Sequence, residues 1–285
     1  MIYNTKIGDQ AGYLMVNSNT QSYDECVKKK SARIKGASRI RNLTINKYIP
    51  LRYLLVLLRE KRLILKPVTT WEDPYENFFL KEQFVKEGDL NKSYSVSVEN
   101  LIKGLYGMSW SLQDETDSLW RIYSQDKLSI RISTSVETLV KAVCSEENKW
   151  DVWIGKVHYK SEEEIENWLN KCVNTETPLQ FLNKMSESFF IKRKAFVAEK
   201  EFRIIVNYVE NNKKNQPHDF VCYKIDPNVF VSEYVVDPRL EKYEYEAVKA
   251  ALVGAGAEDS RIRQSKLYAF KPRKVEMKYD PFWDF

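Results

Sequence analysis

The sequence predicts an α+β fold, with mixed, largely antiparallel sheets and flanking helices. Segments typical of strands and of helices follow one another irregularly along the 285 residues, unlike the strict alternation of a doubly wound sheet. Hydrophobic residues make up 43% of the chain, which is enough to bury a core. The shares of charged residues (30%) and aromatic residues (13%) argue against wholesale disorder.

The chain is expected to have two parts. We expect residues 1–40 to form a basic, flexible N-terminal extension and residues 41–285 to form a single α+β domain. The segment Lys28 to Arg41 reads KKKSARIKGASRIR and contains no acid, so it can contact the phosphates of a nucleic-acid partner. A solvated arm without a partner explains the same residues. The formal net charge of +5 is too small to decide between them.

The first half of the domain combines short strands with three helices. Pro50 is a typical first residue of a helix, whereas Asp73-Pro74 disfavours helix and indicates a loop. The polar stretch 88–100 is the best candidate for a linker or surface loop. The expected elements are a strand at Asn42–Pro50, a helix at Leu51–Arg62, a strand at Leu63–Pro67, a loop at Val68–Phe79 with a helix from about Asn77, a strand at Tyr106–Ser111, and a helix within Asp114–Gln125 whose Leu119, Ile122 and Tyr123 share a face.

The second half continues the irregular mixture. Ser135 is a plausible N-cap, and glycine ends the last helix. The expected elements are strands at Lys127–Ser133, Asp151–Lys160, Phe202–Tyr208, Asp219–Ile225 and Ser232–Pro238, a turn at 211–216, helices at Ser135–Val143, Glu162–Lys171, Pro178–Lys192 and Tyr243–Gly256, and a last edge strand at Ser265–Phe270.

Cysteine, histidine and apolar runs exclude several classes. The four cysteines form no CxxC pair, and with only two histidines a Cys/His zinc site is not expected. Neither His158 nor His218 accompanies a recognisable nucleophile motif, which disfavours Ser-His or Cys-His catalysis. The longest apolar run, YLLVLL, is too short to span a membrane. Without a signal peptide, the cysteine usage fits the cytoplasm.

The best candidate for chemistry is the pair Glu199 and Glu201, separated by Lys200. On a strand their side chains share a face about 7 Å apart, and Arg203 lies on that face too. In a cleft, one carboxylate can stabilise a cationic, oxocarbenium-like sugar while the other orients a nucleophile. Arg203 can neutralise one acid or bind a phosphate. An exposed strand edge protected by charges is the alternative.

Other candidates surround this pair in the sequence. Asp73 and Glu76 lie in the WEDPYE loop, where a turn alone explains Asp73 but not Glu76. Ser109 and Ser111 share a strand face, and Gly107 would let a ligand approach the backbone. Trp120 and Tyr123 can form an aromatic wall or simply pack in the core. There is no GxGxxG, Walker A or HExxH motif, so a dinucleotide would bind by a less glycine-dependent mode.

Five segments occur in an order typical of one bacterial family. They are INKYIP (Lys47, Tyr48), TTWEDPYENFF (Asp73, Glu76), GMSWSLQDETDSLWRIYS (Ser111, Trp120, Tyr123), KRKAFVAEKEFRIIV (Lys194, Glu199, Glu201, Arg203) and YVVDPRLEKYEYEAVKAAL. From Leu43 to Phe270 the chain thereby resembles the domain family DUF2971, whose function is unknown. Glu72 departs from the family's usual Asn before Asp-Pro, which bears on the binding role of that loop, and Phe196 replaces the preferred Trp.

The layout of this family is similar to that of the ADP-ribosyltransferase-like superfamily. The resemblance implies NAD as a substrate, no metal, and a site that contains Lys47, Tyr48 and Arg203. It implies that Glu201 is the catalytic glutamate, which holds a ribose hydroxyl and stabilises the oxocarbenium, and that Glu199 orients the acceptor. Ser109 or Ser111 would support Glu201, and Trp120 or Tyr123 would pack near the nicotinamide ribose. The first strand departs from the pattern, since Lys47-Tyr48 stands where His or Arg is usual.

The resemblance thus predicts a transferase that acts on a macromolecule, as a bacterial defence protein or toxin, with a regulatory partner protein. Two alternatives stay open. In a metal-dependent nuclease, Asp73, Glu76, Glu199 and Glu201 would hold Mg²⁺, with Lys194 or Lys200 near the phosphate. In a non-enzymatic nucleic-acid-binding or protein-binding module of a defence system, the acids would be structural.

Overall fold

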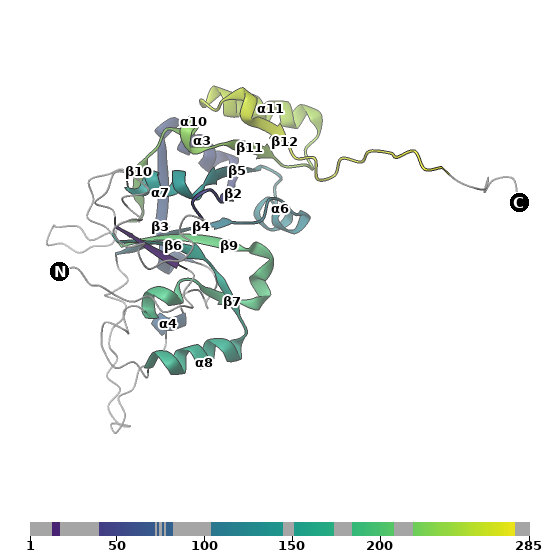
Figure 1. Cartoon of the computed structure of the whole chain (residues 1–285). Coiled ribbons are helices and arrows are strands. Elements are labelled where there is room, and N and C mark those ends of the chain that lie inside the picture. The colour runs from purple at the N-terminus through teal and green to yellow at the C-terminus, as the bar shows by residue number, and fades with distance from the viewer. Residues whose placement is uncertain are drawn as a thin grey trace, which may run out of the picture.

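A computed structural model describes residues 13–17, 40–71, 73, 76, 78–81, 104–144, 151–173, 184–207 and 219–276. It confirms the α+β class, because helices cover both faces of a central sheet (Figure 1). The strands are β1 (Tyr13–Asn17), β2 (Thr44–Pro50), β3 (Arg62–Pro67), β4 (Leu105–Ser111), β5 (Ser129–Ser135), β6 (Asp151–Lys156), β7 (His158–Lys160), β8 (Ile191–Arg193), β9 (Glu201–Asn207), β10 (Val221–Lys224), β11 (Glu233–Val236) and β12 (Ile262–Gln264).

The main sheet has the order β1-β6-β9-β4-β2-β5-β11-β12, and β3 joins β10 to β4. Its pairs are antiparallel except for β11 with β12, and the separate pair of β7 with β8 is parallel. The prediction of largely antiparallel sheets is therefore confirmed.

Two hydrophobic cores lie on the two faces of this sheet. The larger contains leucines of α3 and aliphatic residues of α7 and α11, and the smaller contains aromatic residues of α4 and α8. Strand β9 contributes to both, because Ile204 packs in the larger core and Ile205 in the smaller, as alternation along a strand requires. The helices are α3 (Leu51–Glu60), α4 (Phe78–Lys81), α6 (Asp117–Tyr123), α7 (Val136–Cys144), α8 (Glu162–Val173), α10 (Pro227–Phe230) and α11 (Lys242–Gly254), with 3-10 turns η1 (Val68–Thr70), η3 (Lys194–Glu199) and η4 (Asp259–Arg261).

Strand β4 divides its second edge between two neighbours. It pairs with β2 only at Asn46 and Ser111, and with β3 at Lys66–Gly107 and Pro67–Tyr106. Its other edge pairs with β9 along its whole length. Ser109 therefore lies where neither β2 nor β3 pairs with β4, and this break in the sheet positions the site described below.

Several predicted elements are wrong in detail. The strand expected at Asp151–Lys160 is two strands, β6 and β7, in different sheets, and the helix expected to reach Lys192 ends at 188, after which β8 begins. No edge strand forms at Ser265–Phe270, because the parallel partner of β11 is the earlier β12. Helix α6 buries Leu119 and Trp120, while Ile122 and Tyr123 are exposed rather than in the core.

Some predictions fall outside the described residues. These are the basic segment up to residue 39, Glu72 and Pro74, the polar stretch 88–100 and the turn at 211–216. In the described part of the chain, no helix combines the length and the apolar character needed to cross a membrane.

Candidate active site

The glutamate pair spans a kink rather than one strand. Turn η3 ends at Glu199, Lys200 adopts a left-handed conformation with φ 43°, and β9 starts at Glu201. The predicted spacing along a single strand is therefore wrong. The exposed-edge alternative is also wrong, since β9 lies between β4 and β6 and the exposed fractions of Glu199 and Glu201 are only 8% and 4%.

Both carboxylates converge on a lysine. The Nζ atom of Lys192 lies 2.6 Å from Glu201 Oε1, 2.8 Å from Glu199 Oε2 and 3.3 Å from Glu76 Oε1. Arg203 donates from Nε to Glu201 Oε2 at 2.7 Å and from its terminal nitrogen to Glu76. We call these five residues, Glu76, Lys192, Glu199, Glu201 and Arg203, the charge cluster. When all are ionised, three negative and two positive charges leave it with an excess negative charge.

The two glutamates have different pKa values because their partners differ. Burial, reinforced by a hydrogen bond shared with Glu201, raises the pKa of Glu199 to about 7. Burial alone would also raise the pKa of Glu201, but the charge and hydrogen bond of Arg203 hold it well below its usual range. The pair therefore combines a carboxylate that stays ionised with one that can take up a proton near neutral pH.

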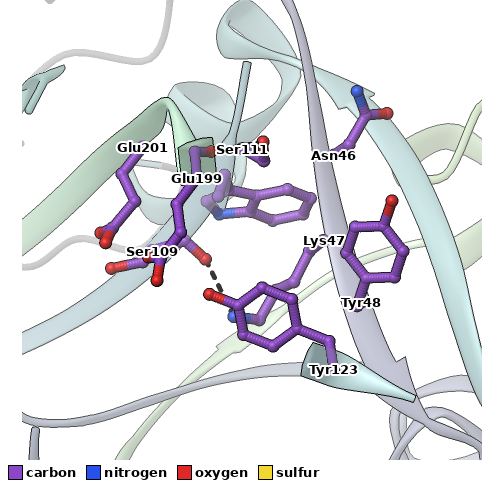
Figure 2. A pocket seen from close by; sticks show the side chains of 9 residues that line it. Asn46, Lys47, Tyr48, Ser109, Ser111, Tyr123, Glu199 and Glu201 are labelled. Carbon is purple, nitrogen blue, oxygen red and sulfur yellow. Dashed lines mark hydrogen bonds between the residues drawn. The ribbon is translucent and has the colours of Figure 1, made fainter. Parts of the chain in front are cut away.

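A small pocket of about 90 Å³ opens at the break between β2 and β4 (Figure 2). Figure 2 shows the rings of Tyr48 and Tyr123 on one side and the side chains of Glu199 and Glu201 on the other. The lining residues are Asn46, Lys47, Tyr48, Ser109, Trp110, Ser111, Tyr123, Glu199 and Glu201. The pocket is therefore both aromatic and acidic.

The aromatic wall is built on α6. The ring of Tyr123 stacks on Tyr48 with centroids 5.7 Å apart, and Trp120 packs edge-on against Tyr48 at 4.8 Å. Tyr123 is 41% exposed as a whole, but its hydroxyl faces Glu199, and the desolvation of that end together with the nearby carboxylates raises the pKa of Tyr123. Tyr123 thus links the aromatic wall to the glutamate pair.

The pocket also contains polar groups that can donate hydrogen bonds. Lys47 donates to the carbonyl of Ser109 at 2.9 Å, and burial lowers the pKa of its amine to about 8 against the opposing charge of Glu201. The hydroxyl of Tyr48 and Nε1 of Trp110 are buried and have no hydrogen-bond partner among the described residues.

The serines of β4 act through the backbone. Ser111 donates from its hydroxyl to the carbonyl of Glu199 at 2.7 Å, which fixes the end of η3. Gly107 does not face a ligand as expected, because Trp71 fills the space beside it: a Cβ built there would lie 2.7 Å from the indole. That indole covers the guanidinium of Arg203 at 4.5 Å.

The structure places the other predicted site residues away from the pocket lining. Arg203 is fully buried, so it neutralises acids but cannot bind a phosphate, and Glu76 lies behind the pair in the charge cluster. Trp120 donates to Glu115 and supports the wall from behind. Asp73 pairs with Arg193, and the 58% exposed Lys194 pairs with Glu164 at the surface.

Sequence reasoning missed four contributors. The sequence pattern predicts Lys192 at the end of a helix, whereas β8 carries it into the charge cluster. Tyr159 of β7 accepts the backbone N–H of Glu201 at 2.8 Å. Asn46 and Trp110 line the pocket next to the predicted Lys47, Ser109 and Ser111. Alternation along β2 and β4 did not indicate them, because both faces of these strands meet the pocket where the strands separate.

The carboxylates of the proposed Mg²⁺ site already have partners. Lys192 and Arg203 bind Glu76, Glu199 and Glu201, and Asp73 pairs with Arg193 instead. Within the described ranges, no group of three or more His, Cys, Asp or Glu residues is arranged to hold a metal ion. Two buried cations would have to leave before a divalent ion could take their place.

Comparison with known proteins supports the family resemblance over part of the chain. Residues 119–204, from Leu119 of α6 to Ile204 of β9, match the family model described as "Protein of unknown function (DUF2971)". No curated protein matches the sequence. A solved structure, Thermus sp. 2.9 DarT in complex with ADP-ribosylated ssDNA, aligns over 80% of this chain and 97% of its own, with 12% identity and a TM-score of 0.37. A likeness of that size does not establish a common fold.

Proposed function

We propose that this protein is an ADP-ribosyltransferase-like enzyme that transfers the ADP-ribosyl group of NAD to an acceptor on a macromolecule. The observation that carries the proposal is the excess negative charge of the buried charge cluster at the pocket wall. A reaction that passes through a cationic sugar is stabilised by fixed negative charge in a site that excludes water. The order Lys47-Tyr48, Ser109-Ser111 and Glu199-Glu201 agrees with the superfamily layout.

The residues of the pocket suit NAD as a substrate. The aromatic faces of Tyr48 and Tyr123 can contact flat rings. A cavity of about 90 Å³ is smaller than typical ligand pockets, so it would take only part of the nicotinamide end, and the rest of NAD would lie across its opening.

The two carboxylates then have separate roles. As the bond between ribose C1′ and the nicotinamide nitrogen breaks, its electron pair leaves with nicotinamide, and ionised Glu201 stabilises the positive charge that develops on the ribose. Glu199 takes up the proton of the attacking acceptor group, while a new bond forms from that group to C1′. Its raised pKa, the result of burial and of the hydrogen bond to Glu201, suits this proton transfer near neutral pH.

We further propose a nucleic acid as the macromolecular acceptor and a role in defence or as a toxin. The support is the acid-free basic segment Lys28 to Arg41, whose positive charges can contact the phosphates of a nucleic acid. Restraint by a regulatory partner protein stays a prediction. The nuclease alternative is weaker, because its carboxylates are already paired with Lys192, Arg203 and Arg193.

Release of nicotinamide from NAD labelled in that ring tests the proposal. We expect release by the purified protein, enhanced by single-stranded DNA or RNA and unaffected by EDTA. Glu201→Gln should lower the rate at least 100-fold, as loss of a transition-state charge partner does. Glu164→Gln, a change at the exposed ion pair with Lys194, is the matched control. Failure of the wild type to release nicotinamide with any nucleic acid, or full activity of folded Glu201→Gln, refutes the proposal.

A further inference from the structure

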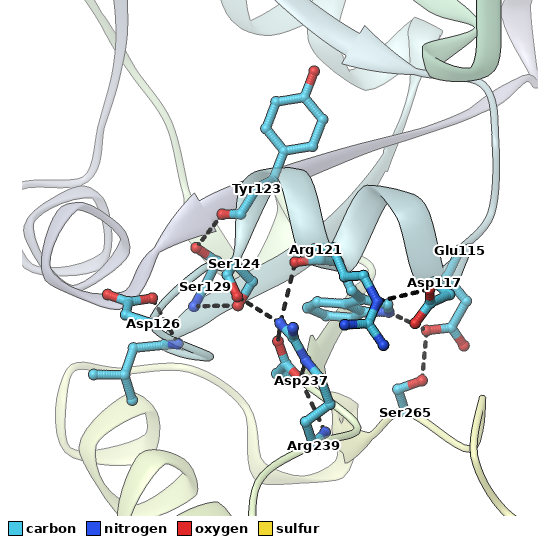
Figure 3. Close-up of polar contacts among 12 residues, drawn as sticks. Glu115, Asp117, Arg121, Tyr123, Ser124, Asp126, Ser129, Asp237, Arg239 and Ser265 are labelled. Carbon is cyan, nitrogen blue, oxygen red and sulfur yellow. Dashed lines mark hydrogen bonds and ion pairs between the residues drawn. The ribbon is translucent and has the colours of Figure 1, made fainter.

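Helix α6 is held at its C-terminal end by an arginine from a distant part of the chain. Arg239 follows β11, and one terminal nitrogen of its guanidinium donates to the carbonyls of Trp120 and Ser124 (Figure 3). Trp120 lies in the last turn of α6, and Ser124 directly follows the helix. Both carbonyls already accept a backbone N–H, from Ser124 and Lys127 respectively, and Arg239 adds a second hydrogen bond to each. A positive charge there also interacts favourably with the helix dipole.

A buried carboxylate fixes the guanidinium in this orientation. Asp237 is fully buried and accepts from Arg239 Nε at 2.9 Å and from its terminal nitrogen at 2.6 Å. The backbone N–H of Arg239 donates to the same carboxylate at 2.9 Å. The sequence DPR (residues 237–239) lies within the last of the five family-like segments and has no role assigned from the sequence. It thus forms a rigid support joined directly to the sheet through β11.

The residues that Arg239 holds flank Tyr123. Trp120 and Ser124 lie on either side of it in the last turn, and its own carbonyl accepts a hydrogen bond from Ser129 at 2.7 Å. A seven-residue helix is too short to be stable alone, so these contacts determine where its end lies. The side chain of Tyr123 then reaches Tyr48 and Glu199 in the pocket.

We infer that Arg239, oriented by Asp237, is a positioning residue that sets the place of Tyr123 in the pocket wall. The contacts that fix this position connect β11 through Asp237 and Arg239 to the end of α6, and Tyr123 then connects α6 to Glu199. The positioning of Tyr123 by Arg239 does not depend on which reaction the protein catalyses, whereas any effect on turnover rests on the proposed function. A residue that only stabilised the fold would lower stability without moving Tyr123.

The experiment follows the ring of Tyr123 directly. Protein containing 3-fluorotyrosine gives a 19F resonance for Tyr123, which is identified by its loss in Tyr123→Phe. We expect Arg239→Ala to shift or broaden this resonance. Arg239→Lys should restore it only in part, because an ammonium lacks the fork that binds the carboxylate and two carbonyls together. Arg121→Ala is the matched control on the same helix, since Arg121 is exposed and pairs with Asp117.

Activity gives a second, separate readout. With NAD as substrate, Arg239→Ala should lower kcat/KM about 10- to 100-fold, as a small displacement of a site group does, with partial recovery in Arg239→Lys. An unchanged Tyr123 resonance in folded Arg239→Ala overturns the inference. If that variant does not fold, an unchanged resonance in Arg239→Lys overturns it equally. A moved resonance in a protein that never consumes NAD supports the positioning role and refutes the proposed function alone.

Discussion

Replacing Lys192 with methionine tests the charge cluster most directly. The change removes the ammonium that contacts both glutamates at 2.6 and 2.8 Å and leaves a side chain of similar length over the ring of Phe196. Glu201 keeps Arg203, but Glu199 loses the ammonium that lies 2.8 Å from it, in a site where its exposed fraction is 8%. The variant therefore isolates the contribution of charge from that of packing.

The expected loss is large because the charges are buried. Removing one partner of a buried ion pair typically costs about 3–5 kcal/mol, since the remaining charge stays desolvated without compensation. For a chain of this size that corresponds to a fall in Tm of about 6–10 °C. Lys194→Met provides the matched control, because Lys194 is two residues away in an exposed pair with Glu164, and such pairs contribute about 0–1 kcal/mol.

The loss should depend on pH in a defined direction. Lys192 lowers the pKa of both glutamates in the folded protein, so its removal raises both above their wild-type values. A folded-state pKa above the unfolded value favours the folded state at low pH, and this advantage disappears as pH rises through the folded pKa. Of the two glutamates only Glu199 has a folded-state pKa above the unfolded value and within this range. The deficit of Lys192→Met relative to wild type should therefore be larger at pH 8 than at pH 5.5, by about 1.4 kcal/mol for each unit by which the pKa of Glu199 rises up to pH 8.

Denaturant unfolding of wild type, Lys192→Met and Lys194→Met at both pH values gives the comparison. Subtracting the wild-type value at each pH removes the contribution of carboxylates elsewhere, such as Glu137, whose hydrogen bond from Arg41 lowers its pKa to about 2. A loss below about 1 kcal/mol at pH 8, or one that grows as pH falls, would contradict the reasoning.

Two further changes test the surroundings of the pair. Tyr123→Phe retains the stacked ring but removes a donor to Glu199, so the pKa of Glu199 should rise. This pKa is followed by 13C NMR of labelled glutamate, and the exposed Tyr53→Phe should leave it unchanged. An equal pKa of Glu199 in both variants would argue against the hydrogen bond. Gly107→Ala should destabilise the protein by about 1–3 kcal/mol in thermal unfolding, because its Cβ would lie 2.7 Å from the Trp71 indole. Gly254→Ala, with nothing within 4 Å, should not lower stability, and equal effects at the two glycines would refute the steric explanation.

Much of the fold and part of the site followed from local patterns. The strand with Lys47 and Tyr48, the strand with Ser109 and Ser111 and the strand after Glu201 lie where hydrophobic alternation and turn residues indicate. Antiparallel pairing then brings Ser111 opposite Glu201 and Asn46 opposite Ser111. These residues line one pocket because the sheet order makes β4 the neighbour of both β9 and β2.

What the sequence did not reveal depends on tertiary context. A helical pattern through Lys192 hid β8, whose partner β7 lies more than thirty residues earlier in the chain. The left-handed Lys200 gave no signal, because neither glycine nor asparagine marks the kink. Arg203 and Lys194 look alike in the sequence as basic residues near the glutamates. Only packing makes the first fully buried and leaves the second in solvent.

The charge cluster also determines how the protein opens. Ile191, next to Lys192, and Phe78, near Glu76, pack in the smaller core, whereas Glu201 and Arg203 belong to β9, which both cores share. If α4 and α8 detached while the sheet stayed intact, Lys192 would separate from the acids that it contacts. Glu199 and Glu201 would then be left with the buried guanidinium of Arg203 alone. Partial opening between the two cores is thereby disfavoured, and we expect their backbone amides to exchange as one cooperative unit. The same contacts that set the protonation of the glutamates make the two halves of the molecule unfold together.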